Sequence, residues 1–370
     1  MTDGSRHRVL RWTSGSSHTD VVAGGYGEGS KSHQLNFPRG VALDSDGALF
    51  VADSQNNRVM RWAQGSTQGE VVAGGVGWHD SLRACCSPQG VALDSDGGLL
   101  VSEGSNHRVT RWTPGATRGE VVAGDHGMGS GLHQFCFPRG IALDHDGALL
   151  VADGRNHRVM RWPAGATHGE VVAGGHGQGI GLHQLNTPQG IAVDCDGTLL
   201  VADDQNHRVM CWSPGATLGQ IDAGGHGAGS GLHQLNHSAA IALDSDGSLL
   251  VVDWENDWIM RWAPGARRGK IEIVVSSPGM LTEDTLVSWS PATDKATSVS
   301  NRALVKLLLM IDARRSSSGL ASLRSMFITG VFPFAFHSHR AAFTSRHSRG
   351  QHRIMELMPA AMVQAEAGTN

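Results

Sequence analysis

The feature that most constrains this chain is a repeat of fifty residues. Segments similar to Val-Ala-Leu-Asp-Ser-Asp-Gly recur at that interval, and a tryptophan keeps the same step. The repeated aspartates are Asp44, Asp94, Asp144, Asp194 and Asp244, and the tryptophans are Trp12, Trp62, Trp112, Trp162, Trp212 and Trp262. No insertion shifts the register between residues 8 and 270. Such strict spacing indicates one structural unit copied in tandem.

Each unit contains four short apolar runs. In the third full copy they are Gly140–Asp144, Ala148–Asp153, His157–Trp162 and Glu170–Gly174. The Asp146-Gly147 pair between the first two runs is a strong signal for a hairpin turn. A Gly-rich connection then leads to the next copy. Four strands in about fifty residues is typical of one blade of a β-propeller, so we expect an all-β fold.

Composition excludes several other classes of protein. Glycine accounts for 50 of 370 residues without a Gly-X-Y period, which rules out collagen. The net charge of −4 is no electrostatic signature of a nucleic-acid-binding protein, and no DNA partner is expected. The five cysteines contain no C-x-x-C pair, which makes a zinc ribbon or a disulfide framework improbable. Without an evident signal peptide or membrane-spanning stretch, the expected location is the cytoplasm.

The copies resemble the NHL repeat. The segments Leu185-Asn-Thr-Pro-Gln-Gly190 and Asn206-His-Arg208 are similar to that family's Leu-Asn-x-Pro-x-Gly and Asn-His-Arg motifs, and Val-Ala-Asp and Asp-Gly-x-Leu also match. The resemblance covers roughly residues 8–275. It implies an NHL-type β-propeller, commonly of six four-stranded blades. Tryptophan at the end of the third run departs from the family, which more often has a smaller residue there.

Ring closure is open at this point. Residues 8–24 contain only a third and a fourth run, so six four-stranded blades are short of two strands. A shortened copy at Ser277–Trp289 could supply them; an open arc and a fragment of a longer chain are the alternatives. We expect a propeller domain over residues 1–289 and an irregular tail over 290–370. From residue 276 onward the formal charge is +4, against −8 before it.

Propeller topology assigns loops to faces. The innermost strand of each blade lines the channel, and the Asn-His-Arg loops and Gly-rich connections share the face that we call the top face. The residue between Pro and Gly before each innermost strand is predicted to stand at the channel mouth. These residues are Arg39, Gln89, Arg139, Gln189 and Ala239. Two cations and two amides suit a carboxylate, a phosphate or an acidic peptide; contact with neighbouring loops alone is the alternative.

Polar residues repeated in every copy have mainly structural interpretations. The acid ending the second run, with Asn and Arg three and five residues on, is predicted to form a hydrogen-bonded clasp. Asp-x-Asp-Gly lacks the later ligands of a calcium loop and is interpreted as a turn. Histidine pairs seven residues apart could hold a metal. The successive pairs are spread around the ring, however, so each belongs to a different blade. Loop hydrogen bonds are the favoured interpretation.

Departures from the repeat are the better candidates for specific contacts, because catalysis needs unlike groups converging on one atom. Trp78, His79, Asp80 and Arg83 replace the usual connection in one copy, and Pro-x-Gly is lost at His237–Ala240. Trp254 and Trp258 change the Asn-His-Arg loop of the last copy, and we expect them to be exposed anchors for a partner.

The predicted function is a non-enzymatic scaffold that binds a protein or peptide on the top face. RNA binding by the same face is one alternative, although the negative propeller disfavours it. A metal-dependent lactonase or lyase of the six-bladed propeller class is the other. The sequence assigns no catalytic residue, no metal ligand and no cofactor, and no membrane partner is expected.

Overall fold

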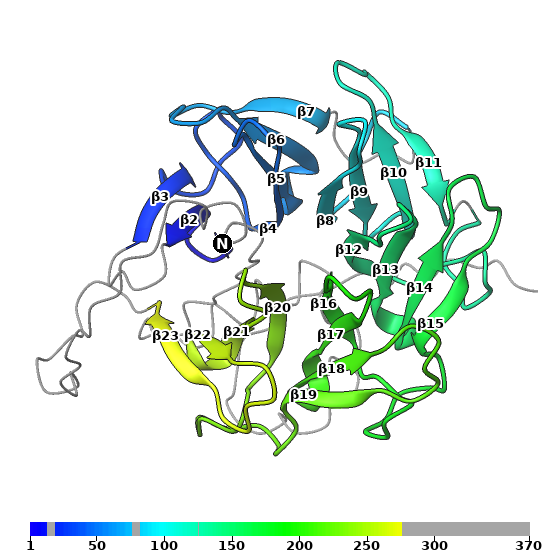
Figure 1. The fold of residues 1–370 in the computed structure, drawn as a ribbon. Coiled ribbons are helices and arrows are strands. Elements are labelled where there is room, and N and C mark those ends of the chain that lie inside the picture. The colour runs from blue at the N-terminus through cyan, green and yellow to red at the C-terminus, as the bar shows by residue number, and fades with distance from the viewer. Residues whose placement is uncertain (13–18, 76–81, 125, 276–370) are drawn as a thin grey trace, which may run out of the picture. The chain divides into compact units, whose positions relative to one another are not determined.

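Six antiparallel sheets are arranged around one axis in the computed structural model, which describes residues 1–12, 19–75, 82–124 and 126–275 (Figure 1). Five sheets have four strands and one has three. The prediction of a six-bladed β-propeller is confirmed. None of the described helices is long and apolar enough to cross a membrane.

The strands follow the repeat. Blade 1 contains β1 (Thr2–Asp3), β2 (Arg8–Trp12) and β3 (Thr19–Gly24). Blade 2 contains β4 (Pro38–Leu43), β5 (Leu49–Asp53), β6 (Arg58–Trp62) and β7 (Glu70–Gly74). Blade 3 contains β8 (Pro88–Leu93), β9 (Leu99–Glu103), β10 (Arg108–Trp112) and β11 (Glu120–Ala123).

The second half of the ring repeats this pattern. Blade 4 contains β12 (Pro138–Leu143), β13 (Leu149–Asp153), β14 (Arg158–Trp162) and β15 (Glu170–Gly174). Blade 5 contains β16 (Pro188–Val193), β17 (Leu199–Asp203), β18 (Arg208–Trp212) and β19 (Gln220–Gly224). Blade 6 contains β20 (Ser238–Leu243), β21 (Leu249–Asp253), β22 (Trp258–Trp262) and β23 (Lys270–Val274). Short 3₁₀ turns follow the second strand of four blades: η1 (Ser54–Asn56), η2 (Gly154–Asn156), η3 (Asp204–Asn206) and η4 (Trp254–Asn256).

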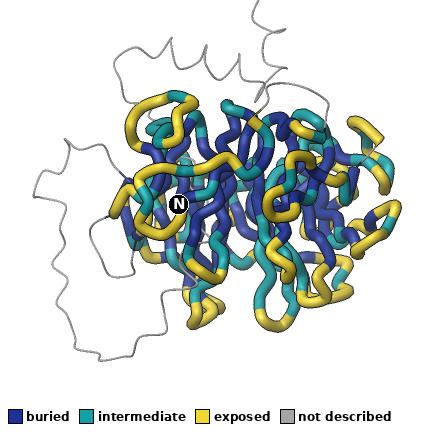
Figure 2. The backbone as a smooth tube through the Cα atoms, turned by 90° about the horizontal axis from the view of Figure 1, so that it is seen from above, coloured by how far each residue is buried: buried dark blue, intermediate teal, exposed yellow. Residues whose placement is uncertain are grey.

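Strands within each blade are hydrogen-bonded in chain order, with the first strand of the four-stranded blades nearest the axis (Figure 1). The middle of the sheets is buried, and the connections at both ends are exposed (Figure 2). The Gly-rich connections do not remain on the top face. Gly169, which precedes β15 at the opposite face, donates its N–H to the Leu132 carbonyl of such a connection at 2.9 Å.

Blade 1 differs from the prediction. Residues 8–24 were expected to hold its only strands, but Thr2 and Asp3 pair with Val9 and Arg8 as a further strand, β1. The expectation is therefore wrong. The sequence did not reveal β1 because a strand of two residues is too short to show alternation of apolar and polar residues. The predicted hairpin at Ser277–Trp289 lies outside the described residues.

The first and last blades share one apolar core. Trp12 and Leu10 of blade 1 are buried in the same cluster as Leu250, Ile259 and Ile273 of blade 6. Elsewhere in the ring, the tryptophan of each blade packs in the same way on the preceding blade, as Trp162 does in a cluster with Phe135 and Val109. Blade 1 therefore takes its place as the neighbour of blade 6, and the ring closes.

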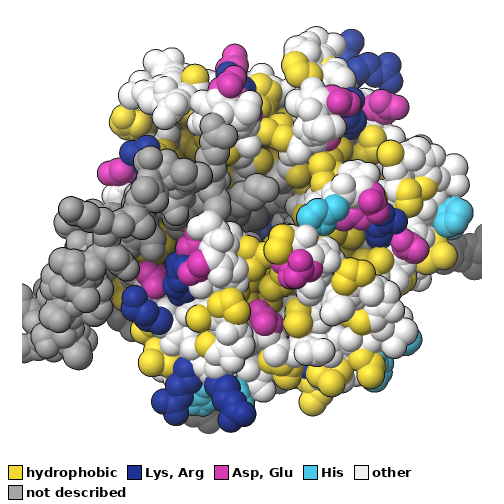
Figure 3. Space-filling model, in the orientation of Figure 1, with side chains coloured by type: hydrophobic (Ala, Val, Ile, Leu, Met, Phe, Trp, Pro, Cys, Tyr) yellow, Lys and Arg dark blue, Asp and Glu magenta, His cyan; other side chains and the backbone are white. Residues whose placement is uncertain are grey.

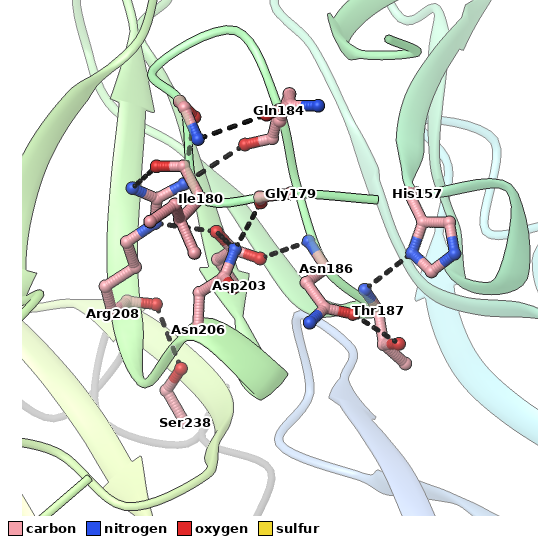
Figure 4. A network of polar contacts seen from close by, with 11 residues as sticks. His157, Gly179, Ile180, Gln184, Asn186, Thr187, Asp203, Asn206, Arg208 and Ser238 are labelled. Atoms are coloured by element: carbon pink, nitrogen blue, oxygen red, sulfur yellow. Dashed lines mark hydrogen bonds and ion pairs between the residues drawn. The ribbon is translucent and has the colours of Figure 1, made fainter. Parts of the chain in front are cut away.

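The predicted clasp is present, and it ties two blades together (Figure 4). In blade 5, one oxygen of Asp203 accepts from Asn206 Nδ2 at 2.8 Å and Arg208 Nε at 2.7 Å. Its other oxygen accepts from the Asn186 backbone N–H at 2.6 Å. The remaining guanidinium nitrogens of Arg208 donate to three carbonyl groups of the incoming connection, those of Ile180, Gly181 and Gln184. Burial raises the pKa of Asp203, while these hydrogen bonds act in the opposite direction.

A histidine forms a second tie between blades. His157 has a left-handed backbone (φ 53°), and its Nδ1 accepts from the Thr187 backbone N–H of the next blade at 3.1 Å (Figure 4). His7, His107 and His207 make the same contact with residues thirty positions ahead. Asn57 fills this place in blade 2, where its Oδ1 accepts from Ser87 N–H at 2.9 Å. The favoured interpretation of these histidines as loop hydrogen-bonding groups is confirmed.

These histidines predict a loss of stability in mild acid. A protonated Nδ1 cannot accept a hydrogen bond, and burial lowers the pKa of His7, His107, His157 and His207 below 6.5. The unfolded chain therefore binds more protons, so their contribution is complete above about pH 6.5 and is lost as pH falls below it. We expect the urea midpoint to decrease between pH 7 and pH 5. Replacing all four by asparagine, the residue that blade 2 carries at position 57, is expected to flatten that profile; an unchanged slope would contradict the assignment.

The opposite face carries the hairpin turns. Asp44 Oδ1 accepts from the backbone N–H of Asp46 and Ala48 at 3.0 and 2.7 Å, so Asp-x-Asp-Gly is a turn, as predicted. Third-strand arginines pair with these turns, as in Arg161–Asp144 at 2.6 Å and Arg261–Asp244 at 2.7 Å. On the face seen in Figure 3, acidic and basic side chains lie beside one another at several points around the ring.

Candidate functional site

The predicted mouth residues meet in the structure. A small cavity at the axis, of volume ≈ 30 Å³, is lined by Arg39, Gln89, Arg139, Gln189 and Ala239, together with Gly140, Gly190 and Ala240. The residues come from the start of the five innermost strands β4, β8, β12, β16 and β20. Their convergence follows from their identical register in each blade.

Glycine follows four of the five mouth residues and allows the innermost strands to approach, whereas Ala240 follows Ala239. A Cβ on Gly40 would lie 2.7 Å from the Gln89 carbonyl oxygen, and one on Gly90 would lie 2.7 Å from the Arg139 carbonyl oxygen. Both neighbours are backbone atoms, so neither can give way. The Pro-x-Gly pattern thus narrows the mouth and leaves only the side chain before the glycine to line it.

Arg39 is a buried cation that lacks a counter-ion among the described residues. The residue is 6% exposed, and its guanidinium lies 5.4 Å from the centroid of the Phe37 ring. Among the described residues, no carboxylate offsets the burial of this guanidinium. Burial and the neighbouring charge of Arg139 lower the pKa of Arg39 to about 9, so it remains protonated at pH 7.

Arg139 is only partly satisfied. Its Nη1 donates to Gln189 Oε1 at 2.7 Å, whereas its Nε is buried and has no partner in the part of the chain that the structure describes. Burial lowers the pKa of Arg139, and the charge of Asp204 opposes that shift. The mouth therefore holds two cations and one nearby carboxylate, and its net charge is positive.

The last blade compensates for a small mouth residue with a large loop residue. A Cβ on Gly154 would lie 2.8 Å from Arg139 Nε, so the long arginine occupies that space in blade 4. In blade 6 the mouth residue is Ala239, and Trp254 at the position equivalent to Gly154 packs against the core that contains Ala239. Trp254 is half-buried, and the prediction that it is exposed is wrong.

Trp258 is half-buried too, which corrects the second prediction of an exposed anchor. It takes the place of the clasp arginine, and its indole Nε1 donates to Asp253 Oδ2 at 2.6 Å. Its ring packs against the core between blades 5 and 6. The residue therefore completes the blade 6 clasp with one donor where arginine offers several.

A polar cluster between blades 5 and 6 was not predicted. Asp204 is buried and lies 3.2 Å from His237 Nδ1, which is also 3.2 Å from Gln205 Nε2. The His207 and His237 rings meet edge to face with centroids 4.9 Å apart. The departure from Pro-x-Gly at His237 was visible in the sequence. Its contact with Asp204 was not, because the two residues belong to adjacent blades.

The candidates in the connection to blade 3 are only partly described. Trp78, His79 and Asp80 lie outside the described residues, and Arg83 is exposed. Arg83 is not among the residues that line the mouth cavity. Their role as a site remains a prediction.

The histidine pairs make edge-to-face ring contacts. His126 and His133 meet edge to face at 4.7 Å between centroids, and Tyr26 and His33 make the same contact at 5.2 Å. Tyrosine in this position shows that the pairing is aromatic. No three His, Cys, Asp or Glu side chains are grouped for metal binding within the described ranges. The cations and amides at the mouth do not fit a metal ion either.

Aromatic and cationic side chains lie near the mouth residues. We define the collar as Phe37, Phe137, Arg155, His237 and Trp254. The first, second and fourth lie two residues before a mouth residue, Arg155 packs on Phe137, and Trp254 packs on the core that contains Ala239. The Arg155 guanidinium lies 4.0 Å from the centre of the Phe137 ring, and His237 and Trp254 meet edge to face. Phe37, Phe137 and His237 have left-handed backbones with φ of 51°, 54° and 61°.

Comparison with known families supports the repeat assignment. The family model of the NHL repeat matches four segments, residues 35–61, 86–112, 135–161 and 185–212. These segments belong to blades 2 to 5. The matched segments do not include blade 6, where Pro-x-Gly and the Asn-His-Arg loop are replaced. No curated protein gives a significant match to the chain.

Solved structures share the fold at low sequence identity. A structure of a nidogen/laminin complex matches with a TM-score of 0.54 and 18% identity over 72% of this chain and 89% of that chain. A gluconolactonase from Xanthomonas campestris matches with a TM-score of 0.50 and 16% identity over 66% and 78% of the two chains. At these identities the likeness concerns the architecture alone.

Proposed function

Because the chain is an NHL-repeat β-propeller, we propose that it is a non-enzymatic scaffold that binds a protein or peptide through the collar on its top face. The observation that carries the proposal is the size of the mouth. A cavity of ≈ 30 Å³ is far below the roughly 300–1,000 Å³ of small-molecule pockets. Recognition here takes place over the surface around the mouth.

The collar has the chemistry of a protein interface. Aromatic residues and arginine are enriched at the centres of such interfaces and supply most of their binding energy. Phe137 and Arg155 are preorganised by their mutual contact, which reduces the entropy lost on binding. One solved structure with this architecture is of a nidogen/laminin complex, so a propeller of this kind can occur in a protein assembly.

The proposal predicts that mild changes in the collar weaken peptide binding. The test is selection of peptides on the intact chain, followed by affinity measurement with Phe137→Thr/Arg155→Gln. Both substitutions introduce residues found at the equivalent positions, Thr187 and Gln205, so the blade should still fold. Loss of one or two interface hot spots typically weakens binding tenfold or more.

The matched control is Leu218→Arg on a turn of the opposite face. Leu218 is 56% exposed, and arginine occurs at the equivalent position 118. Equal loss of affinity in both variants would contradict a top-face site. Binding to RNA that falls steeply with salt would favour the RNA alternative, and metal-dependent lactone hydrolysis would favour the enzyme alternative.

A further inference from the structure

We propose that the channel mouth is a binding site for a single carboxylate, inserted between Arg39 and Arg139 by the partner that the collar recognises. The inference rests on the proposed function for the source of that carboxylate. The site itself is argued from the side chains that line the cavity.

Unsatisfied donors converge on the cavity. Arg39 is more than nine-tenths buried and lines the mouth, and no carboxylate among the described residues offsets its burial. Arg139 lines the same cavity with a buried Nε that no described residue satisfies. A buried charge that lacks a hydrogen-bonding partner is costly, so the folded chain gains stability when an anion supplies one.

Two geometric features select a carboxylate. The guanidinium group presents a planar set of donors that matches the two oxygens of a carboxylate. The cavity of ≈ 30 Å³ is more than the roughly 10–15 Å³ that one water molecule needs by the same measure, so it admits a small planar group. A tetrahedral phosphate with four oxygens is larger. Gln189 Oε1 already accepts from Arg139, which leaves the amide N–H groups of Gln189 as further donors.

The chain contains its own matched variants. Glutamine stands at the mouth position in blades 3 and 5, so Arg39→Gln/Arg139→Gln gives four glutamines in places that the fold tolerates. Without added anion, this double variant should fold and be at least as stable as the wild type, since it removes the buried charge of Arg39 and the incompletely hydrogen-bonded guanidinium of Arg139. Unfolding of the double variant would instead show that the arginines hold the strands together, and would overturn the proposal.

The direct test uses acetate as the probe on the full chain, with chloride at equal ionic strength as the reference. Acetate at several times its dissociation constant should raise the Tm of the wild type by about 2–4 °C over chloride. The double variant should show no such difference. The arginine Nε–H signals of Arg39 and Arg139 should shift in nuclear magnetic resonance spectra of the wild type. Equal stabilisation of both proteins, or a larger effect of phosphate than of acetate, would overturn the assignment.

Selected peptides separate this inference from the proposed function. Affinity should fall tenfold or more when an essential Glu or Asp of the peptide, or its C-terminal carboxylate, is replaced by an amide, and the same loss should follow from the double variant. If the collar variant loses peptide affinity but the Arg39→Gln/Arg139→Gln variant does not, the proposed function is supported and the carboxylate site is contradicted. If acetate raises the Tm of the wild type as expected but no peptide binds, the carboxylate site is supported and the proposed protein or peptide partner is contradicted.

Discussion

Replacing Asp203 by alanine is expected to lower the free energy of unfolding by about 3–5 kcal/mol, because the change leaves the buried Arg208 without its carboxylate. It also removes the acceptor for the Asn186 N–H and the Asn206 amide. Those groups hold the incoming connection, so the damage extends to two blades. Urea denaturation followed by tryptophan fluorescence measures the effect.

An exposed ion pair serves as the control. Arg11 and Asp20 lie 3.0 Å apart with both side chains more than half exposed, so Asp20→Ala should cost below about 1 kcal/mol. Equal costs for Asp20→Ala and Asp203→Ala would contradict the clasp as a source of stability.

Blade 3 suggests a rescue of the same site. There Glu103 replaces aspartate, and its Oε1 accepts a hydrogen bond from Thr110 Oγ1 at 2.7 Å. The four-stranded blades other than blade 3 have methionine at the position of Thr110. Asp203→Glu alone is therefore expected to be poorly accommodated, whereas Asp203→Glu/Met210→Thr should recover part of the loss. A double variant no better than the single one would show that the two positions are independent.

Replacing Trp12 by alanine is the second large effect, and it tests ring closure. Trp12 is buried in the core shared by blades 1 and 6, so its removal should cost about 3–5 kcal/mol, as for other buried aromatic residues. Trp162→Ala, inside the ring between blades 3 and 4, is the matched comparison. The unfolding free energies of the two variants should fall by similar amounts. A cost below about 1 kcal/mol for Trp12→Ala alone would mean that the ring is open at this seam.

The sequence predicted the parts of the site that depend on register. Because each blade repeats every fifty residues, one position per blade meets at the axis, and Arg39, Gln89, Arg139, Gln189 and Ala239 were placed together correctly. The clasp was also predictable, since its carboxylate, amide and guanidinium lie within five residues of one another in every copy. Periodicity determines both features without knowledge of distant contacts.

Contacts between blades were not predictable in the same way. Trp254 and Trp258 were expected to be exposed, but Ala239 leaves room for the first and Asp253 hydrogen-bonds the second. Asp204 was overlooked because His237, its partner, is 33 residues away in the next blade. A residue's exposure depends on neighbours that the repeat brings close only after folding.

The sequence by itself therefore determined the blade, the number of copies and the ring of residues at the mouth, because strand alternation and a constant period are local properties. Only the tertiary structure decided that the first and last blades share a core, and that the histidines tie neighbouring blades. It also decided that Arg39 and Arg139 line one cavity, in which Arg139 Nε has no hydrogen-bond partner among the described residues. These outcomes depend on which side chains contact one another across blade boundaries. Close packing of the blades around the axis determines those contacts, and the local sequence pattern does not.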